Sequence, residues 1–253
     1  MTLSDDALER YSRQLVLPEW TGAAQERLAG ASAIIVGAGA LGCPAATYLV
    51  AAGVGRLGLV DSDAVELSNL NRQPLHSTPD IGLNKAESAA AKLRLVNPDC
   101  LVETYPVRLE EVNAEAIVAG ADVVVDCSDS FATRYLVNDA CCAQGIPLVE
   151  GGVLGFSGLV LPIRPGESAC YRCAFPSEPP AGAVPTCEEA GVLGATAGIV
   201  GAIQALEALK LLTGAVPART DTILQLDAAT LELTHVRTSR RPDCPACAPQ
   251  SGA

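Results

Sequence analysis

A glycine-rich turn at residues 37–42 constrains the fold of this chain more than any other feature. It reads GAGALG and follows the apolar run 33–36. Such a turn joins a strand to a helix, and its backbone N–H groups can face a phosphate or a ribose. Asp61 ends the next apolar run, where a carboxylate can accept hydrogen bonds from ribose hydroxyls. The pattern predicts a nucleotide site that includes Gly37, Gly39, Gly42 and Asp61. The alternative, a turn that merely needs glycine, leaves Asp61 unexplained.

Strand and helix patterns alternate along the chain, which is typical of a parallel sheet with crossover helices. The expected parallel strands are 33–36, 57–60, 101–105, 123–126 and 147–149. Beyond residue 151 the pattern changes, and one long helix is expected over 196–212. Antiparallel strands are expected around it at 158–163, 222–226 and 231–236. The predicted fold class is α/β, a Rossmann-like mostly parallel sheet continued by antiparallel strands.

The 253 residues suffice for one large α/β domain or two small ones, and we expect a single domain over 1–253. Its nucleotide-binding part is expected at about 30–150, and a second part at about 151–253. The proline-rich stretch 176–185 cannot form regular structure and is expected to be a loop. Glycines at 194, 198 and 201 permit the long helix to pack closely, either within the chain or against a second subunit.

Two uncharged segments, 31–55 and 190–206, could be mistaken for membrane spans. The first is interrupted by glycines and Pro44, and the second runs directly into Glu207 and Lys210. A spanning helix would instead be evenly apolar for about 20 residues. The N-terminus starts with acids and lacks the basic region of a signal peptide. We therefore expect no membrane span and a cytoplasmic protein.

The net charge of −12 argues against a nucleic-acid surface, because phosphate backbones are bound by clustered Lys and Arg. Any polyanion must be met by a few local cations. Asn69 and Arg72 lie close together, and Lys85 follows at an expected helix start. These groups suit a triphosphate better than a nicotinamide. The fourth strand ends in DCSD at 126–129, and a carboxylate beside phosphates requires a bridging cation, so we predict Mg²⁺ on Asp129.

Ten cysteines in a chain without a secretion signal indicate thiols or metal ligands. Two C-x-x-C pairs have the spacing at which thiolates share one tetrahedral zinc: Cys170, Cys173, Cys244 and Cys247. A structural Zn²⁺ would then staple the C-terminal tail to a distant loop. The alternative is that one pair is a redox dithiol. Cys187 lies on the proline-rich loop before the long helix. The other cysteines are expected to be core residues: Cys43, Cys100, Cys127, Cys141 and Cys142.

In order along the chain stand RYSRQ at 10–14, the glycine turn, DSD at 61–63, SNLNRQ at 68–73, GLNK at 82–85, DCSD, both cysteine pairs and TCEEAGVLG at 186–194. With these motifs the whole chain resembles the MoeB/ThiF/HesA adenylyltransferases, bacterial relatives of the ubiquitin-activating enzymes. It departs from their pattern at Ser130, where many relatives carry Asn.

The resemblance implies adenylation of the C-terminal Gly-Gly carboxylate of a ubiquitin-like sulfur-carrier protein by ATP, with release of pyrophosphate. It implies that Asp61 holds the ribose, that Asn69 contacts the phosphates, and that Arg72, Lys85 and Mg²⁺ on Asp129 neutralise them. Arg13 would reach the ATP of the neighbouring subunit, which implies a homodimer. The residues from about 151 onward would bind the carrier and zinc. The sulfur donor would be a separate protein, such as a cysteine desulfurase or a rhodanese.

Cys187 has two readings, because relatives use this position for a thioester or persulfide whereas other members need no covalent step. Neither His76 nor His235 is expected to be catalytic, since the carboxylate is already the nucleophile. Family members serve molybdopterin, thiamin, tRNA-thiolation and cysteine pathways. The carrier of each pathway is recognised by a surface and not by a sequence motif. Two other functional classes are an NAD-dependent oxidoreductase, which the glycine turn alone would suggest, and a noncatalytic nucleotide-binding scaffold. Arg72 and Lys85 disfavour both.

Overall fold

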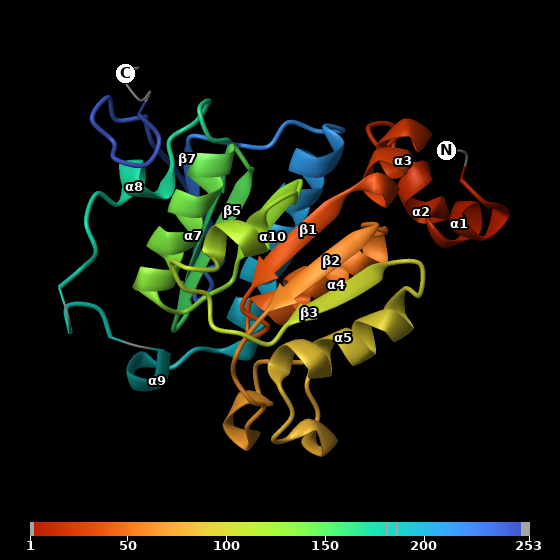
Figure 1. Cartoon of the computed structure of the whole chain (residues 1–253), viewed down its shortest axis with the longest axis horizontal. Helices are drawn as coiled ribbons and strands as arrows, with labels where there is room; N and C mark the ends of the chain where they lie inside the picture. Colours follow the sequence, from red (N-terminus) through yellow and green to blue (C-terminus); the bar gives the residue numbers. More distant parts are fainter. Residues whose placement is uncertain (1–2, 181, 186, 249–253) are drawn as a thin grey trace.

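The computed structural model describes residues 3–180, 182–185 and 187–248. Its strands form one sheet in the order β3-β2-β1-β4-β5-β6-β7-β8 (Figure 1). The strands are β1 (Ser32–Val36), β2 (Arg56–Val60), β3 (Leu101–Tyr105), β4 (Val123–Asp126), β5 (Leu148–Leu154), β6 (Ser157–Ile163), β7 (Thr222–Asp227) and β8 (Glu232–Arg237). Each matches an expected strand, so the strand predictions are confirmed.

The sheet changes from parallel to antiparallel at β5. Strands β1 to β5 pair in parallel, and β5 to β8 pair antiparallel, as the sequence predicts. The difference from expectation is the length of β5, which continues to Leu154 instead of ending at Val149. It continues because its second half pairs with β6 through a tight turn at residues 155–156. The change of pattern at residue 151 therefore falls inside a strand.

Helices cover both faces of the sheet, which gives three layers (Figure 1). One face carries α3, α4, α5 and α10, and the other carries α6, α7 and α8. The helices are α1 (Asp5–Arg10), α2 (Ser12–Leu15), α3 (Gly22–Gly30), α4 (Gly42–Ala52), α5 (Lys85–Val96), α6 (Ala114–Val118), α7 (Phe131–Gln144), α8 (Tyr171–Ala174), α9 (Cys187–Ala190) and α10 (Gly194–Thr213), with short 3-10 turns η1 (Leu67–Asn69) and η2 (Thr78–Asp80).

The alternation of side chains along β1 explains the two hydrophobic cores. Ala33 and Ile35 lie in the core under α4 and α10, whereas Ile34 and Val36 lie in the core under α7. All four side chains are buried. Because successive residues of a strand point to opposite faces, a short, wholly apolar strand must be covered on both sides.

Helix α10 is the long helix that the sequence predicts, and one side of it packs against the sheet and α4. By length and composition it could cross a bilayer, but 50% of its apolar window is buried within the protein. A Cβ atom at Gly201 would lie 2.4 Å from the carbonyl oxygen of Leu41, the N-cap residue of the neighbouring α4. At Gly198, by contrast, an added Cβ would meet no atom within 4 Å. Gly201 therefore serves close packing within the chain.

The sheet opens a crevice at the carboxyl ends of its central strands. Strands β1 and β4 are neighbours, but β2 lies on the far side of β1 and β5 on the far side of β4. The chain therefore leaves the two central strands in opposite directions. Open α/β sheets bind their ligands at such a point. Residues 176–180 and 182–185 form no helix or strand, as predicted for the proline-rich loop.

Candidate functional site

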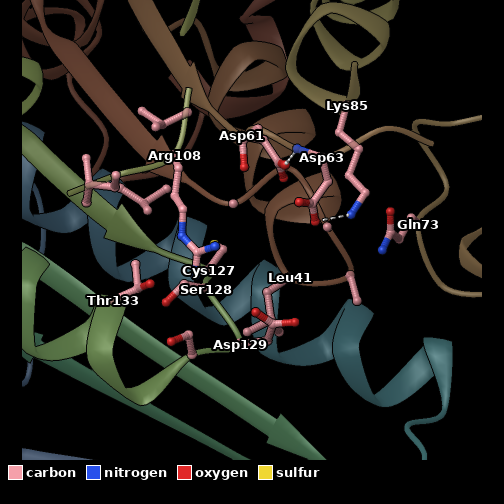
Figure 2. Close-up of a pocket in the computed structure, with 18 of the residues that line it drawn as sticks. Leu41, Asp61, Asp63, Gln73, Lys85, Arg108, Cys127, Ser128, Asp129 and Thr133 are labelled. Atoms are coloured by element: carbon pink, nitrogen blue, oxygen red, sulfur yellow. Dashed lines mark hydrogen bonds and ion pairs between the residues drawn. The ribbon is translucent and has the colours of Figure 1, made fainter. Parts of the chain in front are cut away.

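A cavity of about 260 Å³ lies at the carboxyl ends of β1, β2 and β4 (Figure 2). It collects side chains from separate parts of the sequence because the carboxyl ends of parallel strands meet at one edge. Its charged and glycine lining residues are Gly37, Gly39, Asp61, Asp63, Arg72, Lys85, Arg108, Asp129 and Arg134. The cavity thus combines backbone N–H groups with both cations and carboxylates.

The three glycines of the turn have different physical reasons to be glycine. Gly37 has φ +94°, and a Cβ atom there would lie 2.9 Å from the Cys127 carbonyl oxygen. At Gly42 a Cβ would lie 1.9 Å from the Gly37 carbonyl oxygen. Around Gly39, however, no protein atom would approach an added Cβ closer than 3.6 Å. Gly37 and Gly42 therefore shape the turn, whereas Gly39 keeps space open along the cavity wall.

Both backbone polar groups of Ala38 form hydrogen bonds with side chains. Its N–H donates to Asp61 Oδ2 at 2.8 Å, and its carbonyl oxygen lies 2.9 Å from His76 Nε2. The second oxygen of Asp61 accepts from the Asp63 N–H at 2.9 Å. Burial raises the pKa of Asp61, while the backbone N–H of Asp63 and the charge of Lys85 oppose that shift. Asp61 therefore braces the glycine turn as well as lining the cavity.

Hydrogen bonds fix the tautomer of His76. Lys92 Nζ donates to Ser88 Oγ at 3.2 Å, which leaves the Ser88 hydroxyl hydrogen for His76 Nδ1 at 2.9 Å. Nε2 then carries the proton and donates to the Ala38 carbonyl oxygen. Burial lowers the pKa of His76, which favours this neutral form. The side chain is buried and supports the glycine turn, and His235 lies exposed on β8.

Four cations reach the cavity from separate loops and helices: Arg72, Lys85, Arg108 and Arg134. Lys85 begins α5, where Asn84 caps the helix, and its Nζ lies 2.9 Å from Asp63 Oδ2. Arg72 Nη1 donates to the Ser68 carbonyl oxygen at 2.6 Å. Arg108 follows the end of β3 and extends toward the loop after β4 (Figure 2). A polyanion entering this cavity would therefore meet cations from more than one side.

The two carboxylates of the DCSD motif occupy different environments. Asp129 lines the cavity and is exposed. Asp126 is fully buried in β4, opposite Glu150 of β5. Asp126 ends β4 and Asp129 follows three residues later, but only Asp129 lines the cavity. A metal-binding carboxylate must reach solvent or ligand, so only Asp129 fits that role.

Several predicted site residues do not line the cavity. Asn69 is buried, and its Oδ1 accepts from the Glu66 N–H in the cap of η1. Gly42 lies behind the turn, at the start of α4. Arg13 is exposed on α2, which lies near the amino end of β1, away from the cavity (Figure 1). The side chain of Cys187 lies outside the described residues, although its backbone begins α9.

Four cysteines form a separate cluster beside α7. The sulfurs of Cys170, Cys173, Cys244 and Cys247 all lie within 4.8 Å of one another. Measured Sγ–Sγ distances are 3.8 Å for Cys170–Cys173, 3.5 Å for Cys170–Cys244 and 3.4 Å for Cys173–Cys247. Tetrahedral zinc with bonds of about 2.3 Å would hold its sulfurs about 3.8 Å apart. The cluster therefore fits one zinc ion, and both pairs contribute to it.

The remaining cysteines mostly behave as small apolar residues. Cys43, Cys100, Cys127 and Cys141 are buried, as expected. Burial raises the pKa of the Cys43 thiol to about 12 and that of Cys100 to about 11. Cys142 differs from the expectation, because it is only half-buried on α7.

A second, larger hollow of about 940 Å³ adjoins the cavity, and we call it the groove. Its walls come from the antiparallel strands and from the proline-rich loop, which contributes Glu178, Val184 and Pro185. Both hollows are lined by Asp129, Ser130, Arg134 and Val153. The groove therefore leads from the antiparallel half of the sheet to the inner cavity.

Sequence reasoning missed Arg108 and Arg134 as site residues. Arg108 stands three residues after the end of β3, and the strand-edge rule that selects Asp61 also selects this loop. Arg134 lies in the first turn of α7, five residues after Asp129. No motif marks it, but a charged residue in an otherwise apolar stretch of that helix was a usable signal.

Comparison with known proteins assigns the chain to a family. The ThiF family description matches residues 11–246. The chain is 49% identical to "SAMP-activating enzyme E1" of Haloferax volcanii over 249 residues, covering 98% of this chain and 92% of that protein. It is 48% identical to "Sulfur carrier protein adenylyltransferase" of Thermus thermophilus over 252 residues, covering 98% and 93%.

A longer relative and a solved structure are also similar to the chain. The chain is 50% identical to "Adenylyltransferase and sulfurtransferase MOCS3" of Sus scrofa over 246 residues, 97% of this chain but only 54% of that protein. Among solved structures, E. coli MccB with MccA-N7isoASN superposes with a TM-score of 0.87 at 21% identity, covering 97% of this chain and 76% of that one. That likeness concerns the fold alone.

The oxidoreductase alternative gains no support from these comparisons, since two of the named relatives are adenylyltransferases. The match runs through the glycine turn, the cavity and the first cysteine pair, and it ends one residue before Cys247. The chain therefore belongs to the ThiF family and is an adenylyltransferase.

Proposed function

We propose that this chain uses ATP to adenylate the C-terminal carboxylate of a ubiquitin-like sulfur-carrier protein that ends in Gly-Gly. A carboxylate oxygen of the carrier attacks the α-phosphorus, and the bond from that phosphorus to the bridging oxygen of pyrophosphate breaks. The products are an acyl-adenylate and pyrophosphate. The observation that carries the proposal is the opening between a charged, glycine-lined cavity and a larger groove. The names of the full-length relatives support the carrier as substrate.

The inner cavity is proposed to hold ATP. The open face at Gly39 lets phosphate oxygens approach the backbone, and the Asp61 carboxylate lies where a ribose would be bound. Arg72 and Lys85 would neutralise the phosphates, which the approach of a second anion requires. Asn69 would contribute indirectly by holding the segment that carries Arg72, because its side chain caps η1 and its carbonyl oxygen accepts from the Arg72 N–H.

Asp129 is proposed to hold Mg²⁺ together with phosphate oxygens. Its carboxylate is exposed in the cavity, and magnesium in proteins favours one or two carboxylates with phosphate and water oxygens. When bound, the ion would supply positive charge to the leaving pyrophosphate. The residues of this chain need not remove a proton, because the carrier carboxylate is ionised at neutral pH. His76 is neutral and both its ring nitrogens are hydrogen-bonded within the protein, which is consistent with a reaction that needs no general base.

The groove is proposed to hold the extended tail of the carrier. One wall is formed by residues 152–154 of β5 and 157–159 of β6, so the tail would lie along this pair of strands. The proline-rich loop forms the opposite wall. A Gly-Gly terminus carries no Cβ atoms, so it can pass the opening between the groove and the cavity most easily. The carrier body would remain outside, against β7 and β8.

Three further parts of the proposal concern assembly and sulfur. We propose a homodimer in which Arg13 reaches the ATP of the partner, because α2 lies far from the cavity of its own chain. The cysteine cluster would hold a structural Zn²⁺ and leave no open position for catalysis. The sulfur would come from a separate cysteine desulfurase or rhodanese, with Cys187 as the candidate for a covalent intermediate.

Mass spectrometry tests the proposal. The purified protein is incubated with ATP, Mg²⁺ and each Gly-Gly-ending carrier of its organism. The mass of the carrier is then measured to detect the addition of AMP. We expect one carrier to gain AMP with matching release of pyrophosphate. The same carrier without its last glycine serves as the control and is expected to stay unmodified. Absence of an adenylate on every carrier, with ATP bound, would count against the proposal.

A further inference from the structure

Arg134 lies where the cavity and the groove meet. It lines both hollows and its side chain is 11% exposed. Among the described residues that line the groove, it is the one cation. The acidic residues of the same lining are Asp129, Glu178, Asp227 and Glu232. A negatively charged group that travels along this groove therefore finds its first opposite charge at the inner end.

The guanidinium of Arg134 is held flat against β5. An added Cβ atom at Gly152 would lie 2.7 Å from Nη1 and 3.1 Å from Nη2, so the absence of a side chain at Gly152 makes room for the guanidinium. Nη2 donates to the Ser128 carbonyl oxygen at 3.2 Å. The Phe131 ring lies on another side, 5.6 Å from the guanidinium carbon. These contacts fix the direction in which the remaining N–H groups point.

Two buried carboxyl groups lie behind Arg134. Asp126 of β4 and Glu150 of β5 are partners across the sheet, and both are fully buried. Arg134 Nε lies 3.5 Å from Glu150 Oε1. As two carboxylates, Asp126 Oδ2 and both oxygens of Glu150 would have no donor. A hydrogen bond between the two carboxyl groups resolves this, and it requires that one of them is protonated.

Arg134 keeps N–H groups with which it can bind a ligand. Burial raises the pKa of Glu150, and the charge of Asp126 adds to that shift, so Glu150 keeps the shared proton. The pair carries one negative charge, which Arg134 balances. One guanidinium N–H donates to Ser128, while Nε–H faces Glu150 at 3.5 Å without a hydrogen bond. At least two N–H groups of Nη1 and Nη2 therefore remain for a ligand, even if the neighbouring Tyr171 hydroxyl accepts one.

We propose that Arg134 binds the terminal carboxylate of the carrier and holds it at the opening, facing the nucleotide cavity. This inference rests on the proposed function. Asp126 and Glu150 act as positioning residues, since they hold the guanidinium from behind without contacting the substrate. Gly152 is the second requirement, because any side chain there would displace the guanidinium. A planar guanidinium suits this role, since it can donate two parallel hydrogen bonds to one carboxylate.

The test compares two forms of the carrier in the absence of ATP. One ends in the free Gly carboxylate and the other in the corresponding C-terminal amide. With the wild-type protein, the carboxylate form is expected to bind at least about tenfold more tightly, as a charged hydrogen bond requires. Titration calorimetry measures both dissociation constants. The ratio, unlike either constant alone, reports contact with the carboxylate itself.

The variant is Arg134→Gln combined with Glu150→Gln, because removal of Arg134 alone would leave a buried acid without its counter-charge. The ratio of the two dissociation constants is expected to fall to near one. Gly152→Ala, which keeps every charge, is expected to lower the ratio as well. Arg172→Gln is the matched control: Arg172 pairs with Asp139 outside both hollows, and the ratio should stay as in the wild type.

Each outcome has a distinct meaning. If the double variant binds both carriers more weakly but keeps the wild-type ratio, Arg134 has only a structural role and the inference is wrong. An unchanged ratio in Gly152→Ala, with an intact ATP affinity, would also contradict it. If the wild-type protein binds neither carrier form, the proposed function itself fails, and the inference fails with it.

Discussion

Alanine at Gly39 and at Gly42, introduced one at a time, should separate ligand space from protein packing within a single turn. At Gly42 the new Cβ would lie 1.9 Å from the backbone oxygen of Gly37, which no side-chain rotation can relieve. Overpacking of this kind costs about 1–3 kcal/mol. The gain in helix propensity from Gly to Ala offsets at most about 1 kcal/mol of this. With a net cost of about 1–2 kcal/mol, we expect Gly42→Ala to lower the melting temperature by roughly 2–8 °C.

At Gly39 the balance is the opposite. The nearest protein atom to an added Cβ is the Gln73 side-chain nitrogen at 3.6 Å, an ordinary contact. The stability of Gly39→Ala should therefore stay within about 0.5 kcal/mol of the wild type. The methyl group would instead occupy cavity space beside the backbone N–H groups. We expect the Kd for ATP to rise at least about tenfold, equivalent to about 1.4 kcal/mol.

Thermal unfolding without ligand and equilibrium binding of ATP measure the two effects independently. Gly39→Ala is expected to change binding with little change in melting temperature, and Gly42→Ala to change melting temperature first. Gly198→Ala serves as the control for a glycine-to-alanine change in a helix, because an added Cβ there meets no atom within 4 Å. Wild-type ATP affinity in Gly39→Ala would refute the reasoning that this face of the turn contacts the nucleotide.

The remaining predictions concern zinc, pH and the dimer. Cys244→Ser is expected to lose bound zinc, measured by plasma mass spectrometry, and about 4 kcal/mol of unfolding free energy; wild-type protein without zinc would contradict this. Burial raises the folded-state pKa of Glu150 above its ordinary 4.5, so wild-type stability should fall as pH rises from that value toward the raised one. Glu150→Gln should reduce that fall in urea unfolding at pH 5 and pH 8, and an equal fall in both proteins would argue for an ionised Glu150. Inactive Arg13→Ala and Asp129→Asn proteins, when mixed, should recover up to about a quarter of the wild-type sites if each site uses both subunits; no recovery despite subunit exchange would exclude that arrangement.

The sequence was informative wherever a rule links position along a strand to position in space. Gly37, Asp61 and Asp129 each follow an apolar run, and parallel strands end at one edge, so their proximity needed no three-dimensional information. The cysteine cluster could also be predicted, since tetrahedral zinc with four thiolate ligands requires the two C-x-x-C pairs to lie close together. The ends of α10 were displaced by only a residue or two, because its apolar pattern is long.

Prediction failed where the outcome depends on neighbours that are distant in sequence. Asp126 and Asp129 look alike in the chain, but only the pairing of β4 with β5 decides that Asp126 is buried opposite Glu150. Arg134 becomes a site residue only because β5 and α7 bring the two hollows together beside it. Asn69 stands in a site motif, yet its side chain is used by the local cap of η1.

The course of β5 has a practical consequence for protein engineering. Its first residues pair with β4 beside the nucleotide cavity, and its last residues pair with β6 beside the groove. A chimaera joined at residue 151 would set the first half of β5 from one parent against β6 from the other, although the two were not selected to pack together. Exchange of the C-terminal part between relatives should instead be made after β6, in the hydrogen-bonded turn at residues 164–168, where no ladder is interrupted.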